Sequence, residues 1–258
     1  MGLSSGPHIF SPEYYERLER FEQDHPWSLH MQRLAFALFG RHGGGNLRRT
    51  LDAGCGAGYF TRLWQAQSGA AVFGIDSSLD GLRLARERGL RGLAAGSVAA
   101  IPFRTGCFDA VYCADVIQHL DTAAAASTLA EFARVLRPGG LLLIRAAARR
   151  GLASKRHRDT ADYQQWEPEK LRAQLPPCGL TVEWMSLVNW LPSLAADLAA
   201  ARRPTPAGDV GLPAAPAIPT GLTRAVLRAY WSLEAACLLR CGGRLPGGHT
   251  LLCLARKS

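Results

Sequence analysis

Hydrophobic residues in this chain gather into short runs that alternate with amphipathic stretches. The runs are mostly free of charge, which is typical of strands buried on both faces of a parallel sheet. Between them, apolar residues recur at helical spacing, and glycines close several of these segments. Strands that alternate with helices predict an α/β fold with a mainly parallel sheet. The expected strands cover residues 51–53, 70–75, 93–96, 108–113, 141–144, 180–187 and 250–255.

Two helices are expected before the first strand. Ser11, Pro12 and Glu13 form a helix start, with an N-cap serine, a proline in the first turn and an early acid. Apolar residues at helical spacing predict a second helix over residues 28–39, ending at Gly40. Residues 43–45 then read as a flexible glycine link to the first strand.

The last two expected strands are separated by about 60 residues, far more than the ~2–5 residues of a hairpin loop. Helical spacing marks residues 194–202 and 220–240, while residues 204–219 are rich in Pro and Ala. One interpretation makes residues 192–245 an inserted helical cap over a site, with an apolar lining for a lipophilic substrate. The other makes them a helix pair that covers the sheet edge or forms a dimer contact.

A glycine-rich turn follows the first strand, in the sequence TLDAGCGAGYF from residue 50 to residue 60. A strand, a tight glycine turn and a helix form a ligand crevice at the carboxyl ends of parallel strands. Gly54, Gly56 and Gly58 permit unusual backbone torsions and close approach of a ligand. The dinucleotide fingerprint requires a glycine where Tyr59 stands, so the turn indicates a different cofactor. Asp76 ends the second strand, where α/β nucleotide sites place the acid that binds ribose hydroxyls.

The segment LDAGCGAG resembles motif I of the class I S-adenosylmethionine-dependent methyltransferases. Three later segments, GSVAAIPF, FDAV and EFARVLRPGGLLLI, are similar to further motifs of that family, so the resemblance covers residues 50–145. It implies a Rossmann-like seven-stranded sheet, parallel with one antiparallel strand and flanked by helices. It also implies an N-terminal helical lid (residues 1–45) on a methyltransferase domain (residues 46–258), with S-adenosylmethionine as the cofactor.

The resemblance assigns the cofactor site residue by residue. The glycine turn holds the methionine and ribose parts, and Asp76 binds the ribose hydroxyls. Ser97 stands where the family usually has an acid that meets the adenine amino group, so a hydroxyl replaces a charge there. From the lid, Arg33 is a candidate partner for the cofactor carboxylate, the alternative being that Arg33 is solvated and the aromatic residues of the lid belong to the core. The full predicted set is Tyr14, Arg33, Asp52, Gly54, Gly56, Gly58, Asp76, Ser77, Ser97, Val98, Ala114 and Asp115.

The acceptor side of the site is less marked in the sequence. Methyl transfer to oxygen or carbon often needs a base, and His119, shortly after the fourth strand, is the first candidate, although it also fits a helix histidine near the cofactor. His157 and Tyr163, in the loop after the fifth strand, are second candidates. Arg145 ends the fifth strand, where it holds an anionic acceptor or pairs with an acid. The segment ADVIQHL at 114–120 lacks the Asn/Asp-Pro-Pro-Tyr motif typical of DNA and protein-glutamine methyltransferases.

Composition narrows the function further. The net charge is +9, but only three of the 30 basic residues are lysines and the arginines are spread along the chain, so no nucleic-acid partner is expected. No apolar run approaches the ~18 residues of a membrane span, no secretory signal is recognised, and the seven cysteines read as reduced thiols of a cytoplasmic protein. No metal site is expected, and either a monomer or a homodimer fits.

The function expected from these observations is transfer of a methyl group from S-adenosylmethionine to a small, lipophilic metabolite, in specialised or quinone-like biosynthesis. Two alternatives stay open. An RNA or protein methyltransferase would account for the basic charge, and a non-catalytic cofactor-binding module would account for Ser97.

Overall fold

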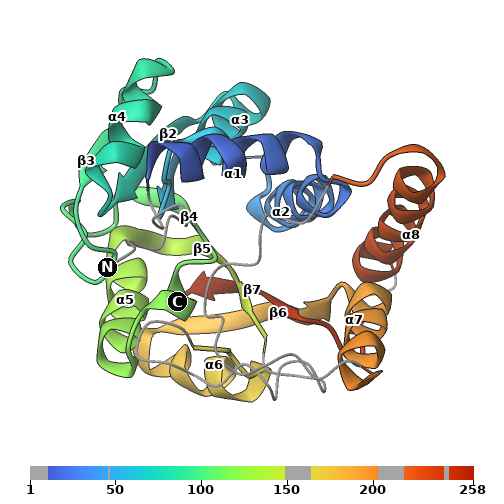
Figure 1. Ribbon diagram of the computed structural model, residues 1–258. Helices are drawn as coiled ribbons and strands as arrows, with labels where there is room; N and C mark the ends of the chain where they lie inside the picture. Colours follow the sequence, from blue (N-terminus) through green and yellow to red (C-terminus); the bar gives the residue numbers. More distant parts are fainter. Residues whose placement is uncertain (1–10, 46, 149–163, 203–217, 241–243) are drawn as a thin grey trace, which may run out of the picture.

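The computed structural model describes residues 11–45, 47–148, 164–202, 218–240 and 244–258, in which strands and helices alternate as the sequence pattern predicts (Figure 1). The strands are β1 (Arg49–Ala53), β2 (Ala71–Asp76), β3 (Leu93–Ala95), β4 (Phe108–Ala114), β5 (Leu136–Ala147), β6 (Leu180–Val188) and β7 (Thr250–Lys257). The α-helices are α1 (Pro12–Asp24), α2 (Pro26–Gly43), α3 (Tyr59–Ser68), α4 (Leu79–Glu87), α5 (Thr122–Val135), α6 (Pro168–Gln174), α7 (Trp190–Arg202) and α8 (Gly221–Arg240). Two short 3-10 helices, η1 (Ile117–His119) and η2 (Pro176–Cys178), follow β4 and α6.

These strands form one seven-stranded sheet in the order β3-β2-β1-β4-β5-β7-β6. Neighbouring strands from β3 to β5 run parallel, whereas β7 runs antiparallel to both β5 and β6. The expected sheet with one antiparallel strand is therefore confirmed, and so is the pairing of the last two strands. The chain adds β2 and β3 on one side of β1 and then returns to add β4 and β5 on the other side. Such a switch point opens a crevice at the carboxyl ends of the strands.

Helices cover both faces of this sheet. On one face, α2 and α3 pack Leu34 and Trp64 against Tyr112 and against β5 and β7. On the other face, α5 and α6 contribute Phe132 and Leu171 to a second apolar cluster. With both faces buried, a ligand can reach the sheet only at the ends of its strands.

Helix α2 is longer than the sequence pattern indicates. It begins at Pro26, capped by His25, and it continues through Gly40 to Gly43, where Gly44 takes a left-handed conformation (φ 60°). The predicted end at Gly40 is therefore wrong, and the link predicted at 43–45 begins one residue later, because Gly43 is still helical while Gly44 and Gly45 form a turn. Tertiary contacts hold the extra turn, since the His42 Nδ1 atom lies 2.7 Å from a Glu183 carboxylate oxygen.

Helix α7 begins at Trp190, four residues before the predicted start. Its first N–H groups are bound by a residue distant in sequence: Glu234 of α8 accepts from the backbone N–H of Asn189 and of Trp190, both at 3.1 Å. Asn189, a common N-cap residue, precedes this start, but its side chain binds Thr250 and Trp231, so the cap comes from Glu234 instead.

A buried polar network around Glu234 joins α2, α7 and α8. The His30 Nε2 atom lies 2.9 Å from Glu234 Oε2, and the Tyr230 hydroxyl donates to the other carboxylate oxygen. Trp231 extends the network by donating from its indole N–H to Asn189 Oδ1 at 3.1 Å. Glu234 is only 5% exposed, so its charge depends on these partners.

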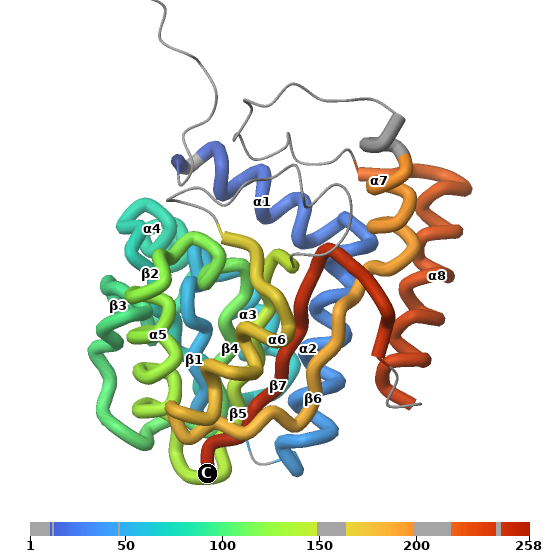
Figure 2. The backbone as a smooth tube through the Cα atoms, turned by 90° about the horizontal axis from the view of Figure 1, so that it is seen from below, coloured from blue at the N-terminus to red at the C-terminus, as the bar shows by residue number. Residues whose placement is uncertain are grey.

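The network places the described part of the 192–245 insertion at the β6 edge of the sheet. There α8 packs beside α2, and α7 lies below it (Figure 1). Viewed across the strands, α7 and α8 stand together at one side of the sheet, while α1 crosses over the strand ends (Figure 2). Neither α8 nor any other described helix is long and apolar enough to cross a lipid bilayer.

We expect Glu234→Ala to lower the free energy of unfolding by about 3–5 kcal/mol, because it leaves several buried donors without their acceptor. Denaturant unfolding followed by circular dichroism measures this loss. Glu87→Ala, at the exposed end of α4, is the matched control and should change stability by less than ~0.5 kcal/mol. Equal effects of the two substitutions would contradict a stabilising role for the network.

Candidate functional site

The turn after β1 is fixed by backbone hydrogen bonds to β2. The N–H groups of Gly54 and Cys55 both donate to the carbonyl of Ile75, at 2.8 and 3.0 Å. Gly54 has φ 83°, and a Cβ atom there would lie 2.1 Å from Val116 Cγ2. At Gly58 (φ 76°), a Cβ atom would lie 2.3 Å from Leu90. Only glycine fits these two positions, so the spacing in the sequence reflects steric necessity.

Asp76 closes β2 beside this turn. Its two carboxylate oxygens accept the backbone N–H groups of Gly56 and Ser78, at 2.7 and 2.8 Å. Burial raises the pKa of Asp76, although these hydrogen bonds act in the opposite direction. The carboxylate is half-buried, and a carboxylate oxygen that accepts one hydrogen bond can accept a second. The neighbouring Ser77 is exposed.

Asp52, the second-last residue of β1, has a buried carboxyl group. The Thr61 hydroxyl of α3 donates to Asp52 Oδ2 at 2.6 Å, within the sheet-to-helix connection. Burial raises the pKa of Asp52 to about 7, against the opposing effect of the Thr61 hydrogen bond. Its charge is therefore sensitive to the occupants of the crevice.

An ion pair crosses the carboxyl ends of β4 and β5. Arg145, which is 9% exposed, donates from Nε and Nη2 to Asp115 Oδ2 at 3.0 and 2.5 Å. Asp115 has φ 56°, and its N–H donates to the carbonyl of Arg145 at 2.9 Å. The guanidinium carbon lies 5.2 Å from the centre of the Trp27 ring, as in a cation–π contact. Ala114 and Asp115 thus belong to a rigid corner of the crevice, and the alternative that Arg145 pairs with an acid is the arrangement found.

Helix α1 covers the glycine turn from above (Figure 2). The Tyr15 ring lies directly against Gly56, where a Cβ atom would come within 3.0 Å of it. Glu19 binds Arg62 at 3.1 Å and also pairs with Arg88, so α1 is tied to α3 and to the end of α4. Tyr14 packs edge-on against Tyr15, with ring centres 5.5 Å apart. Burial, and then the charge of Asp115, raise the pKa of Tyr14.

Glu22 of α1 is a further candidate for the site, and the sequence motifs do not mark it. Burial raises its pKa to about 8; the charge of Arg145 lowers it, and the charges of Asp52 and Asp115 raise it further. This carboxyl therefore lies in the same electrostatic environment as the crevice acids. A signal was present in the sequence, because Glu22 follows Tyr15 by seven residues and so shares its helix face.

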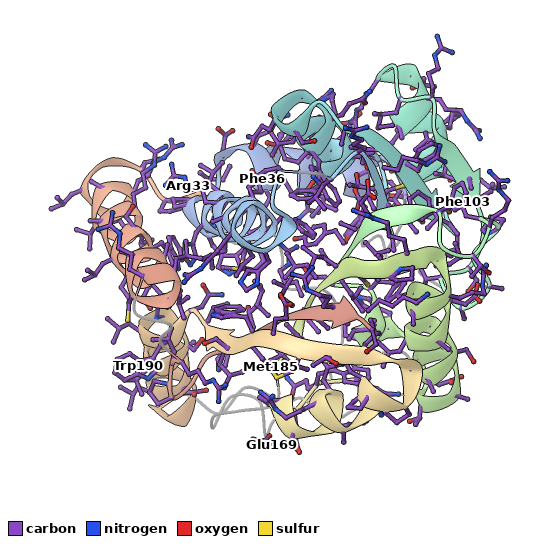
Figure 3. The ribbon with its side chains drawn as sticks, turned by 180° about the vertical axis from the view of Figure 1, so that it is seen from behind. Arg33, Phe36, Phe103, Glu169, Met185 and Trp190 are labelled. Atoms are coloured by element: carbon purple, nitrogen blue, oxygen red, sulfur yellow. The ribbon has the colours of Figure 1, made fainter. Side chains whose placement is uncertain are left out.

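Three further residues of the predicted cofactor set, Arg33, Ser97 and Val98, differ in their exposure. Arg33 is exposed on α2 and lines a hollow of about 370 Å³ with Phe36 and Tyr59 (Figure 3). Ser97 is exposed, and its hydroxyl accepts the N–H of Ala99 at 3.1 Å. Val98 is buried in the core cluster beside the third strand.

The candidate bases are placed only in part. His119 is exposed in η1, at the mouth side of β4. Its neighbour Gln118 is buried and accepts the N–H of Ala147 at 2.8 Å, which ties η1 to the end of β5. His157 and Tyr163 lie outside the described residues. In the described part of the chain, no group of three or more His, Cys, Asp or Glu side chains is placed to hold a metal ion.

Residues 51–144 match the protein family described as "Methyltransferase domain". Over this part of the chain, the match, the sheet order and the glycine turn agree in indicating a class I S-adenosylmethionine-dependent methyltransferase domain. The region contains β1 to β5 and the crevice between them, which is the part that the sequence motifs also identify.

Known relatives agree with this class. Malonyl-(acyl-carrier protein) O-methyltransferase of Serratia marcescens is 36% identical over 99 residues, which is 38% of this chain and 38% of that protein. Ubiquinone biosynthesis O-methyltransferase of Bordetella avium is 33% identical over 116 residues, or 43% of this chain and 44% of that protein. The chain thus matches about two fifths of the length of these relatives.

Solved structures extend the similarity of fold beyond the matched region. Phosphoethanolamine N-methyltransferase 2 of Haemonchus contortus, solved with S-adenosyl-L-methionine, aligns with a TM-score of 0.61 and 18% identity over 99% of this chain and 61% of that one. SpnF, whose structure is described as that of a 4+2 cyclase, aligns with a TM-score of 0.56 and 21% identity over 88% of this chain and 80% of that one. Both likenesses concern the fold.

The residues present fit S-adenosylmethionine. Asp76 keeps acceptor positions for ribose hydroxyls at the end of β2, and the glycine turn offers a closely approachable backbone next to it. Arg145 is paired with Asp115, and its charge also acts on Asp52 and Glu22, so acids outnumber cations among these four residues. This balance suits a ligand that carries a sulfonium and an ammonium group.

We expect Asp52→Asn to remove a pH dependence of stability. Because the pKa of Asp52 is raised from 3.8 to about 7, folding favours the protonated carboxyl. The wild type should therefore lose stability as the pH rises from about 4 to about 7, and the loss should be complete above that window. The variant should gain on the wild type by on the order of 1–3 kcal/mol across it.

Urea unfolding of the cofactor-free protein between pH 4 and pH 8 measures this difference. Asp80→Asn, at an exposed acid of α4, is the control and should track the wild type at every pH. A constant offset between Asp52→Asn and the wild type would contradict the raised pKa.

Proposed function

We propose that this protein transfers a methyl group from S-adenosylmethionine to a small, lipophilic metabolite. The observation that carries the proposal is the placement of α1, which covers the glycine turn and is held there by Tyr15 and by the ion pairs of Glu19. A crevice covered in this way favours a small acceptor over a folded macromolecule, because a duplex or a protein surface would have to displace the helix.

The chain's own groups would bind and orient the reactants. Asp76 would hold the ribose, the N–H groups and carbonyls of the glycine turn would lie along the methionine part, and Ser97 with Val98 would meet the adenine. When bound, the cofactor supplies an electrophilic methyl group on its sulfonium. Orientation of two reactants in a closed crevice can contribute ~7–11 kcal/mol to rate acceleration. Arg145, held by Asp115 and Trp27, would fix the geometry of the acceptor side.

The relatives favour oxygen as the acceptor atom, since those reported above are named as O-methyltransferases of malonyl-(acyl-carrier protein) and of ubiquinone biosynthesis. The alternative of an RNA or protein methyltransferase predicts salt-sensitive RNA binding. The alternative of a chain that binds the cofactor without methyl transfer draws on Ser97 and on the likeness of fold to a cyclase. Cofactor binding and turnover, measured separately, distinguish the three.

Asp76→Ala should abolish cofactor binding. The carboxylate would supply acceptors for the ribose, and its loss also leaves the N–H groups of Gly56 and Ser78 without a partner. Calorimetry with S-adenosylmethionine and S-adenosylhomocysteine should show at least a ~100-fold rise in Kd, equivalent to about 2.7 kcal/mol. Asp80→Ala, four residues further along, should bind like the wild type. Unchanged affinity of Asp76→Ala would contradict the proposed site.

His119→Ala should lower turnover by ~10²–10⁴-fold while the Kd of the cofactor stays unchanged, as expected for loss of a general base. The ring is exposed at the mouth side of β4, where an acceptor can reach it. His42→Ala, at the opposite end of the sheet, is the matched control. Turnover within a few-fold of the wild type would exclude His119 as the base.

A further inference from the structure

Exposed apolar side chains are concentrated in one region of this protein. Among the described residues, eight large hydrophobic side chains are exposed, and all but Leu79 belong to α7 or α8. Scattered exposed apolar residues are ordinary, but a concentration on two neighbouring helices indicates an interaction surface. The seven residues are Trp190, Leu191, Leu194, Leu198, Leu222, Val226 and Leu233, and we call them the outer apolar surface.

On α8, this surface forms a stripe along one helix face. Leu222, Val226 and Leu233 are spaced by four and seven residues and are 80%, 56% and 71% exposed. The opposite face is buried, with Trp231 and Leu238 packed toward α2 and the sheet. The stripe therefore points away from the protein, and the inner face already provides the packing that α8 needs.

Helix α7 extends the surface. Leu191, Leu194 and Leu198 follow one another at helical spacing and are each about half exposed. The N–H of Leu191 donates to the Tyr230 hydroxyl at 3.1 Å, which links the start of α7 to the middle of α8. Both helices lie together at the β6 edge of the sheet (Figure 2). Trp190, the first residue of α7, lies on the same side of the molecule (Figure 3).

The outward charge of this region has one sign. Arg228 and Arg240 of α8 are exposed, as is Arg244 just beyond. The acids of the described parts of α7, α8 and residues 244–249 are Asp197 and Glu234, and they are 9% and 5% exposed. The outer apolar surface is thus bordered by arginines whose charge no exposed acid of these segments balances.

We propose that the outer apolar surface docks onto an anionic membrane surface. Leucine, valine and tryptophan side chains beside arginines are the combination by which interfacial helices lie in the headgroup region, with the apolar face in the acyl boundary. Anionic headgroups supply the negative charge that this side of the protein lacks. The surface docks peripherally and does not span the bilayer, and its docking is independent of methyl transfer.

The charge pattern favours a membrane over a second copy of the chain. A twofold interface through α8 would bring the same patch of both subunits together. Arg228 and Arg240 of both subunits would then enter the same interface, without an exposed acid on these helices to pair with them. A headgroup layer imposes no such repulsion.

Vesicle co-sedimentation of the full chain, without substrate, tests the proposal. The protein should bind vesicles that contain phosphatidylglycerol at least ~10-fold more tightly than vesicles of phosphatidylcholine alone, and added salt should weaken the binding. Absence of binding to both kinds of vesicle, or equal binding to both, would overturn the proposal.

Two variants locate the surface. Leu222→Ser combined with Val226→Ser and Leu233→Ser should reduce binding to anionic vesicles ~10-fold or more, whereas Leu79→Ser on α4 should leave it unchanged. Arg228→Glu should weaken binding more than Arg83→Glu, at an exposed arginine of α4. Circular dichroism confirms that each variant is folded. If sedimentation velocity instead shows a dimer that the triple variant dissociates, and vesicle binding is absent, the occupant is a second copy and the proposal is wrong.

Discussion

The site depends on a set of hydrogen bonds between the glycine turn and the end of β2. Ile75 accepts two consecutive N–H groups of the turn through one buried carbonyl, and Asp76 accepts the next N–H through its carboxylate. The turn is therefore fixed by Ile75 and by Asp76, the acid that we propose binds the ribose. The parallel register of β1 and β2, in which Ala53 lies opposite Ile75, sets the geometry of the crevice before any ligand is bound.

Electrostatics in the crevice follow from one cation among several acids. Arg145 is bound by Asp115, and this pair leaves Asp52 and Glu22 without a full counter-charge. Burial raises the pKa of both carboxyls, to about 7 and about 8. Near neutral pH each carboxyl is therefore only partly ionised. A cationic ligand in the crevice would favour the charged forms. The same groups that weaken the empty crevice thus suit a ligand with positive charge.

Much of the fold could be predicted from the sequence, because its determinants are local. The strands are apolar runs, and Gly54 and Gly58 are required by backbone torsion and by contacts that no Cβ can satisfy. The errors arose where distant residues decide. Glu234 starts α7 early, and His42 with Glu183 prolongs α2 past Gly40. Glu22 was missed because its significance lies in the charges of Arg145, Asp52 and Asp115, which are distant in sequence and which its helical spacing from Tyr15 does not by itself reveal.

The Glu234 network also fixes the positions of α7 and α8 relative to the sheet. It binds α8 to α2 through His30 and to α7 through two backbone N–H groups, and Asn189 continues it to Thr250 of β7 at 3.0 Å. Moving α8 outward would leave these buried groups without partners, and each would lose the compensation for its removal from water. Helix α1 is held differently: Glu19 pairs with partly exposed arginines, and such pairs are individually weak. The described part of the insertion is therefore held by buried hydrogen bonds, whereas the cover that α1 forms over the glycine turn depends more on side-chain packing, such as that of Tyr15 against Gly56.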